Sequence, residues 1–152
     1  MKKLLPALVL LLSSSLDANE LDGSVYIDPI ALKDNAYFFS SQRQISRNFA
    51  IEFGILIYNG VGTNLPSTYG YNYNVKYYFK RFMSGPFISL GRNSLSFFQD
   101  QFYGYTGMGN SMTLGTEIAM SKRITISPGF TVMQFPDINT TVAGYSLLIG
   151  FR

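Results

Sequence analysis

The sequence predicts an all-β protein: an eight-stranded antiparallel up-and-down transmembrane β-barrel. Three observations predict it. Apolar residues alternate with polar or small residues in segments of about ten, the length of a strand that crosses a membrane at a tilt. The connections between these segments are alternately short and long. Charged residues are scarce, at 14%, whereas aromatic residues reach 16%, which suits a protein surface that faces lipid.

The N-terminus has the layout of a secretory signal peptide. Lys2 and Lys3 form a positive start, residues 4–12 are mostly apolar, and residues 13–18 are mostly small. The apolar run is too short to cross a bilayer as a helix. We therefore expect residues 1–18 to be a cleaved signal peptide, with Ser15 as an alternative cleavage point, and residues 19–152 to form a single barrel domain.

The alternation is clearest in residues 69–80, where Tyr69, Tyr71, Tyr73 and Val75 are separated by polar residues and glycine. The expected strands are residues 23–32, 36–45, 49–58, 69–80, 87–98, 111–121, 124–132 and 144–151. Both faces of the 87–98 segment are partly apolar, so its orientation stays open.

The connections divide into two sets. Residues 46–48, 80–85 and 121–123 are short and carry Lys or Arg, whereas 59–66, 99–110 and 136–140 are longer on average and rich in Gly, Asn, Pro or Thr. Residues 33–35 are short for an outer loop. Membrane barrels have short periplasmic turns and longer outer loops, so placing both termini on the periplasmic side puts each set at its own end.

The strand faces indicate which side meets lipid. A backbone in a bilayer must satisfy its own hydrogen bonds, so the sheet must close, and we expect the apolar faces to point outward. The opposite faces carry small residues and few charges, which suits a narrow lumen filled by side chains. There we expect a network of buried charges that pair because an unpaired one is costly, and we favour a structural over a catalytic or transport role. Its members are Asp28, Glu52, Lys76, Arg92 and Glu117.

The final segment, Gly-Tyr-Ser-Leu-Leu-Ile-Gly-Phe at residues 144–151, together with the signal segment and the eight alternating strands, resembles the small outer-membrane barrels typified by OmpX and the OmpA membrane domain. The stretches 24–29 and 122–129 also resemble uncharacterised small barrel proteins of Gram-negative bacteria. The resemblance covers residues 22–152 and is one of pattern. It implies an outer-membrane location and a terminal strand that the barrel-assembly machinery reads. That signal would be Tyr145, Leu147, Ile149 and Phe151, although Arg152 follows where such chains commonly stop.

Residue types restrict the chemistry that this chain can perform. It contains no His and no Cys, the usual base, thiol nucleophile and transition-metal ligands. A Ser activated by Lys76 is formally possible, but no partner Ser is placed beside it. Without residues 1–18 the chain keeps ten basic and eight acidic side chains, too balanced to indicate nucleic-acid binding. We expect no enzyme activity, no cofactor and no metal.

Several local features have simple interpretations. The glycine-rich residues 104–109 lack the context of a phosphate loop and are expected to be a flexible outer loop. Asp100 and Asp137 fall in proposed outer loops, where they could contact a divalent cation or lipopolysaccharide. Pro29 and Pro128 fall within proposed strands and predict a bulge or a local break in pairing.

The first functional hypothesis is a monomeric, non-enzymatic integral outer-membrane protein with a structural or surface-interaction role. Its partners would be outer-membrane lipid and lipopolysaccharide. The alternative is a periplasmic, lipocalin-like barrel that holds an apolar ligand inside, which requires the aromatic faces to point inward. A small channel is a third hypothesis, and the strand number counts against it.

Overall fold

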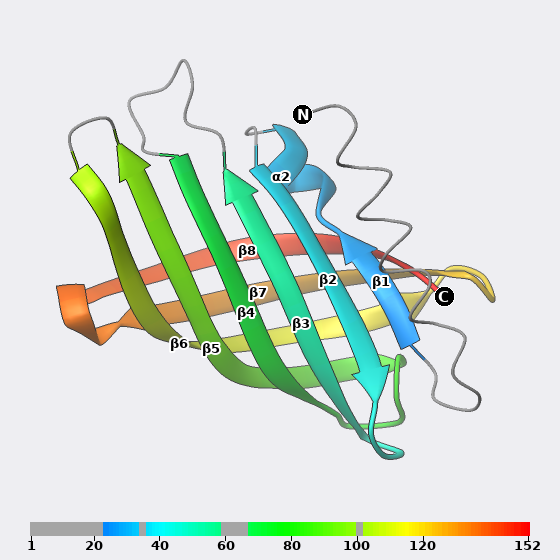
Figure 1. The fold of residues 1–152 in the computed structure, drawn as a ribbon. Helices are drawn as coiled ribbons and strands as arrows, with labels where there is room; N and C mark the ends of the chain where they lie inside the picture. The colour runs from blue at the N-terminus through cyan, green and yellow to red at the C-terminus, as the bar shows by residue number, and fades with distance from the viewer. Residues whose placement is uncertain (1–22, 34–35, 59–66, 100–101) are drawn as a thin grey trace.

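The alternating segments of the sequence form the strands of a single closed sheet in the computed structural model (Figure 1). The structure describes residues 23–33, 36–58, 67–99 and 102–152. The strands pair antiparallel in sequence order, and the barrel closes where Tyr26 pairs with Gly150. They are β1 (Gly23–Ile27), β2 (Ala36–Gln44), β3 (Phe49–Tyr58), β4 (Ser67–Tyr78), β5 (Gly85–Gln99), β6 (Phe102–Ala119), β7 (Ile124–Phe135) and β8 (Thr140–Phe151). The predicted eight-stranded up-and-down barrel is therefore confirmed.

The pleat of each strand separates an outer apolar wall from a polar lumen. In β4, Tyr71, Tyr73 and Val75 are exposed on the outside, whereas Asn74 and Lys76, which alternate with them, are buried inside. Successive side chains of a strand point to opposite faces, so this alternation continues around the sheet. The apolar faces point outward, as predicted.

Two elements differ from the sequence prediction near the start of the barrel. β1 ends at Ile27, five residues before the predicted end of that strand, and α2 (Pro29–Lys33) follows. Asp28 accepts hydrogen bonds from the backbone N–H groups of Ile30 and Ala31, at 2.8 and 3.2 Å. This is helix N-capping, and a proline suits the first helical position because its missing N–H is not needed there. Pro29 therefore begins a helix and makes no bulge.

β6 begins much earlier than expected. It runs from Phe102, so residues 104–109 belong to a long strand that pairs with β5, and the prediction of a flexible loop there is wrong. Glycines that looked like loop signals let the sheet pack closely here, because a Cβ on Gly109 would lie 2.7 Å from the Gln134 carbonyl oxygen.

Pro128 lies within β7 and breaks the pairing on one side only. Between β6 and β7, Gly115 pairs with Gly129 and Ile118 pairs with Ile126, but the residues between these two pairs are unpaired. The register is the same before and after the gap, so no residue is inserted. On the other side Pro128 keeps its place opposite Leu147 of β8. The interruption matches the missing N–H of proline.

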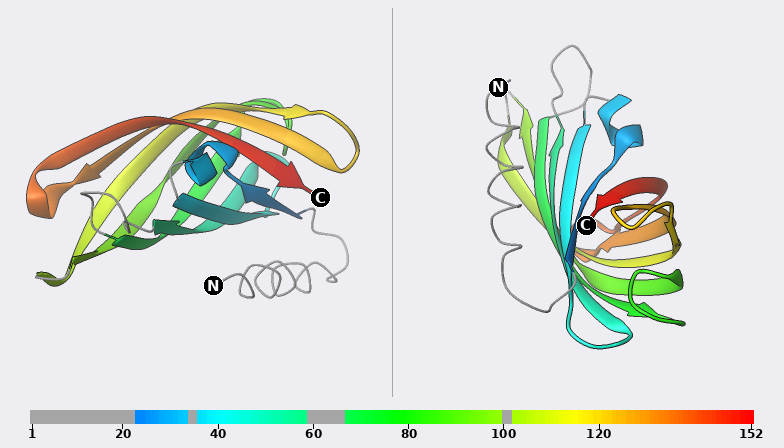
Figure 2. Two further views of the ribbon diagram at one scale, coloured as in Figure 1. Left: turned by 90° about the horizontal axis from the view of Figure 1, so that it is seen from above. Right: turned by 90° about the vertical axis from the view of Figure 1, so that its right-hand side faces the viewer.

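The connections lie at two ends of the barrel. We call the end that carries the β2–β3, β4–β5 and β6–β7 connections and the C-terminus the turn end, and the opposite end the loop end; the right-hand view of Figure 2 looks toward the turn end. The loop end carries α2 and a short 3-10 helix, η1 (Pro136–Ile138), which contains the exposed Asp137. Asp100 lies outside the described residues, as does the predicted signal peptide. No helix among the described residues is long and apolar enough to cross a membrane.

Candidate functional site: the lumen and its closed end

Lys76 is the centre of a buried ion-pair cluster inside the barrel. It points inward from β4, is 2% exposed, and its Nζ lies 2.9 Å from Glu52 Oε2 and 3.4 Å from Glu117 Oε1. Glu52 comes from β3 and Glu117 from β6, so the cluster joins neighbouring and distant strands across the lumen. Lys76 also donates a hydrogen bond of 2.7 Å to the side-chain oxygen of Gln42.

Glu117 is held by hydroxyl donors as well as by Lys76. Its Oε1 accepts a hydrogen bond from Tyr78 at 2.7 Å and another from Tyr26 at 3.0 Å. The Tyr78 hydroxyl in turn accepts a bond of 2.7 Å from the Gln42 amide. Two hydroxyl groups and the Lys76 ammonium therefore donate to the same buried carboxylate oxygen, and such charge-assisted hydrogen bonds are stronger than neutral ones.

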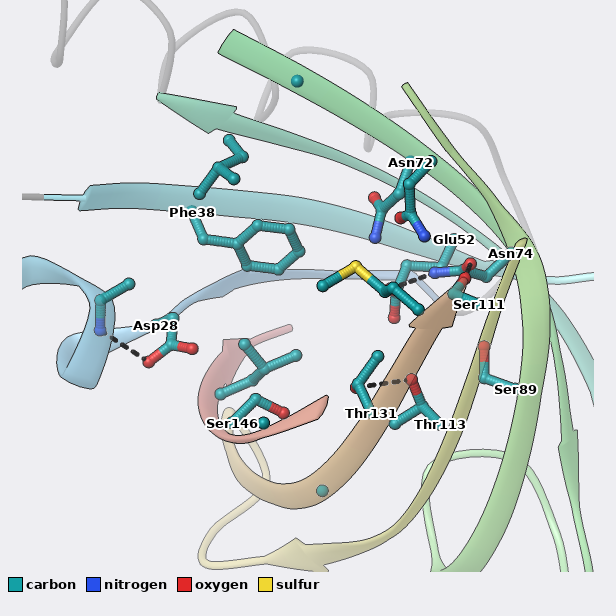
Figure 3. Close-up of a pocket in the computed structure, with 18 of the residues that line it drawn as sticks. Asp28, Phe38, Glu52, Asn72, Asn74, Ser89, Ser111, Thr113, Thr131 and Ser146 are labelled. Atoms are coloured by element: carbon teal, nitrogen blue, oxygen red, sulfur yellow. Dashed lines mark hydrogen bonds between the residues drawn. The ribbon is translucent and has the colours of Figure 1, made fainter. Parts of the chain in front are cut away.

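Glu52, the second carboxylate of the cluster, is held by a chain of amide and hydroxyl side chains from other strands. The Asn74 amide donates to its Oε1 at 3.1 Å, and Ser111 donates to the Asn74 amide oxygen at 3.3 Å (Figure 3). The Lys76 ammonium also lies 4.3 Å from the centre of the Phe87 ring, a favourable cation–π distance. The cation therefore contacts two carboxylates, an amide and an aromatic face at once.

The structure brings together three of the five charges that the sequence placed in the network, namely Glu52, Lys76 and Glu117. The other two lie outside the cluster. Asp28 is buried and lines the lumen at the loop end, but it caps α2 and forms no ion pair with Lys76. The placement of Arg92 in the lumen is wrong. Arg92 lies on the outer wall of β5, opposite the outward Tyr73, and its Nε lies 3.4 Å from the Asn110 side-chain oxygen. The 87–98 segment is apolar on both faces, so alternation alone could not orient Arg92; its buried neighbour Asn93 fixes the orientation.

The turn between β4 and β5 closes one end of the lumen. Met83 is 2% exposed, has a φ of 56°, and packs in a buried cluster with Tyr26 and Leu148, while Phe82 packs against the same cluster. The Phe82 N–H donates to the Arg47 carbonyl oxygen at 3.0 Å, which ties this turn to the β2–β3 turn. Sequence reading missed this cap; two adjacent apolar residues within a basic turn were the available signal.

The loop half of the lumen contains a cavity of about 270 Å³ (Figure 3). The predicted filling of the lumen by side chains is therefore found in the turn half of the barrel, and the prediction is wrong for the loop half. Several small or amide side chains line the cavity toward the Lys76 cluster, among them Asn72, Ser89 and Thr113. Apolar side chains line its remaining surface, including Phe38, Leu56, Leu95, Met133 and Leu148.

The predicted assembly-signal residues lie on β8, the strand that closes the barrel. Tyr145 is 83% exposed and Phe151 is 45% exposed, and both point to the outer wall. Ile149 pairs with Ile27 of β1 and with Ile126 of β7. Recognition of these four residues by the barrel-assembly machinery stays a prediction. Within the described residues, no group of three or more Asp, Glu, His or Cys side chains is arranged to hold a metal.

Comparison with solved structures finds the same architecture in other barrels. The N-terminal β-barrel domain of Pseudomonas aeruginosa OprF matches with a TM-score of 0.64 and 11% identity, over 86% of this chain and 96% of that one. Neisserial surface protein A matches with a TM-score of 0.51 and 13% identity, over 86% and 94%. The fold is that of the small eight-stranded outer-membrane barrels. No protein-family model and no curated protein matches the sequence.

Proposed function

We propose that the chain is a non-enzymatic integral outer-membrane protein with a closed lumen. It would contribute to the structure of the envelope or contact partners through its loop end. One observation carries the closed lumen: the Lys76 cluster and the Met83 cap lie in series across the turn half of the barrel.

The outer wall supports the membrane location. Large apolar side chains are exposed around the sheet where a soluble protein would carry charges, and such a contiguous apolar surface needs an apolar environment. Exposed examples come from four strands: Phe53, Tyr71, Leu114 and Phe130. The periplasmic ligand-binding barrel requires these faces to point inward, so the orientation of the side chains counts against that alternative.

The role of the cluster is structural in this proposal. Eight strands leave an interior that side chains can fill, and the cluster fills it with groups that pair with each other. Its residues lie away from the exposed surface, and neither a His nor a Cys is available to it. The partners we propose are outer-membrane lipid, lipopolysaccharide and, during biogenesis, the barrel-assembly machinery.

Conductance of planar bilayers tests the closed lumen. The purified, folded chain should give no reproducible open events, while a large porin added to the same bilayers gives steps. Heat-modifiable gel mobility of the same sample shows that the barrel is folded. Reproducible single-channel openings by the folded chain would contradict the closed lumen.

A further inference from the structure

The turn end of the barrel is surrounded by exposed cationic side chains, which we call the basic collar. Each of the three turns contributes to it, and so do the end of β2 and the C-terminal residue. Every member is exposed. The members are Arg43, Arg47, Lys80, Arg81, Lys122, Arg123 and Arg152.

No Asp or Glu side chain of the described residues neutralises the collar. The ion pairs found there both belong to Lys76 inside the lumen, with Glu52 and Glu117. Asp28 and Asp137 lie at the loop end. Two acids precede β1 in the sequence, at positions 20 and 22, but they lie outside the described residues and are fewer than the collar cations. All the side chains of the collar are thus positively charged, and such a surface attracts an anionic partner.

Aromatic contacts place the collar at a definite depth. Phe49 and Tyr77 lie beside each other on the outer wall next to the turn end, with ring centroids 5.0 Å apart, and Tyr77 contacts Phe79 at 5.4 Å. Phe79 is 60% exposed and directly precedes Lys80. Aromatic girdles of membrane barrels lie at the level of the lipid headgroups, so the collar lies where lipid phosphates lie.

We propose that the basic collar binds the headgroups of anionic glycerophospholipids in the leaflet at the turn end. This inference rests on the proposed membrane location. Arginine side chains can hold a phosphate with two parallel hydrogen bonds, while lysine acts as a point charge. The Lys80–Arg81 and Lys122–Arg123 pairs would each hold a neighbouring phosphate. Preferential binding of anionic lipid would fix the position of the turn end in the leaflet and enrich acidic lipid around the barrel.

A cell-wall polymer is the rival anionic partner. Collar residues directly follow exposed aromatic residues of the outer wall: Lys80 follows Phe79, and Arg152 follows Phe151. That placement favours lipid phosphates, which lie beside the wall, over a polymer that lies farther away.

Spin-labelled lipids test the proposal with the full chain reconstituted in phosphatidylcholine bilayers. Electron paramagnetic resonance measures how strongly labelled phosphatidylglycerol associates with the barrel relative to labelled phosphatidylcholine. We expect a several-fold preference for phosphatidylglycerol that falls at high salt. The variant with Lys80→Gln, Arg81→Gln, Lys122→Gln and Arg123→Gln should lose most of it. Arg92→Gln, which removes an exposed arginine of the wall outside the collar, should keep it.

Each sample is first checked for heat-modifiable mobility, which separates the two levels of the proposal. A chain that fails to insert contradicts the membrane location itself. An inserted chain with no lipid preference, or with a preference that the collar variant retains, overturns the collar proposal alone. Collar-dependent binding to isolated cell-wall sacculi in the absence of any lipid preference would also overturn it.

Discussion

Among the described residues Lys76 is the cation that pairs with both buried carboxylates, so its removal leaves each of them without a cationic partner. Breaking a buried ion pair from one side costs about 3–5 kcal/mol, because the remaining charge stays desolvated. We expect Lys76→Met to lower the free energy of unfolding by that amount, measured by urea unfolding of the barrel in phospholipid vesicles. Lys122→Gln, at an exposed position in the β6–β7 turn, should change it little. A loss below about 1 kcal/mol in Lys76→Met would show that the cluster does not stabilise the barrel.

Met83 closes the lumen at the turn end, and its side chain is almost fully buried against Tyr26 and Leu148. Truncation of a buried methionine leaves a cavity, and the expected loss for Met83→Ala is about 2 kcal/mol. The same urea titration measures it. Met120→Ala is the matched control, because Met120 is 62% exposed near the same end. Equal effects of the two substitutions would contradict a cap formed by Met83.

For single residues, the sequence predicted which charged side chains join the lumen cluster only where the strand alternates cleanly between apolar and polar residues. Glu52, Lys76 and Glu117 lie on segments with one polar face, and all three point inward. Arg92 lies on a segment with two partly apolar faces, so its direction depends on the register with β4. Asp28 precedes a proline, and its role as a helix cap depends on a local helix that period-two alternation does not predict.

Within β8, two glycines on the same inner face provide a matched pair of substitutions. A Cβ on Gly150 would clash with the Tyr26 ring and the Thr125 hydroxyl, whereas a Cβ on Gly144 has nothing within 4 Å. Gly150→Ala should displace the Tyr26 ring that bonds Glu117, and overpacking of this kind costs about 1–3 kcal/mol. Gly144→Ala should be close to neutral. Urea unfolding of both variants measures the difference, and equal stability would contradict the close packing of Tyr26 on β8.

The two faces of the strands can be tested by placing a charge on each. Ile55→Arg and Leu147→Arg put a cation on the outer wall, where an arginine near the bilayer midplane costs about 2–4 kcal/mol. Both should slow insertion into vesicles and lower stability. Thr113→Arg points into the lumen, where it should disturb the 2.8 Å contact between the Thr113 and Thr131 hydroxyls and leave the lipid face intact. Harmless outward substitutions would mean that these side chains do not meet lipid.

Element boundaries were harder to predict than element identity. β3, β5 and β7 begin within two residues of the predicted starts, because apolar alternation and turn residues coincide there. β6 extends through a glycine-rich segment that sequence reading assigns to a loop. Glycine marks a turn in one context and close strand packing in another, and only the neighbouring strands decide between the two.

The whole barrel was predictable from the sequence because strand number and alternation agree with one topology. Connection length was a weaker guide, because the long loop expected at 99–110 shrinks to the two residues between Gln99 and Phe102. The cavity in the loop half was not predictable, because it depends on how side chains from many strands combine across the lumen. The collar was visible in the sequence only as basic turns; its meaning depends on their meeting at one end of the closed sheet.

The central claim is that a closed barrel lies in the outer membrane with its apolar wall in lipid. Cell fractionation with detergent extraction, followed by gel migration of unheated and heated samples, tests it most directly. The account predicts recovery in the outer-membrane fraction and a band whose mobility changes on heating. Recovery as a soluble periplasmic protein with no such change would contradict it.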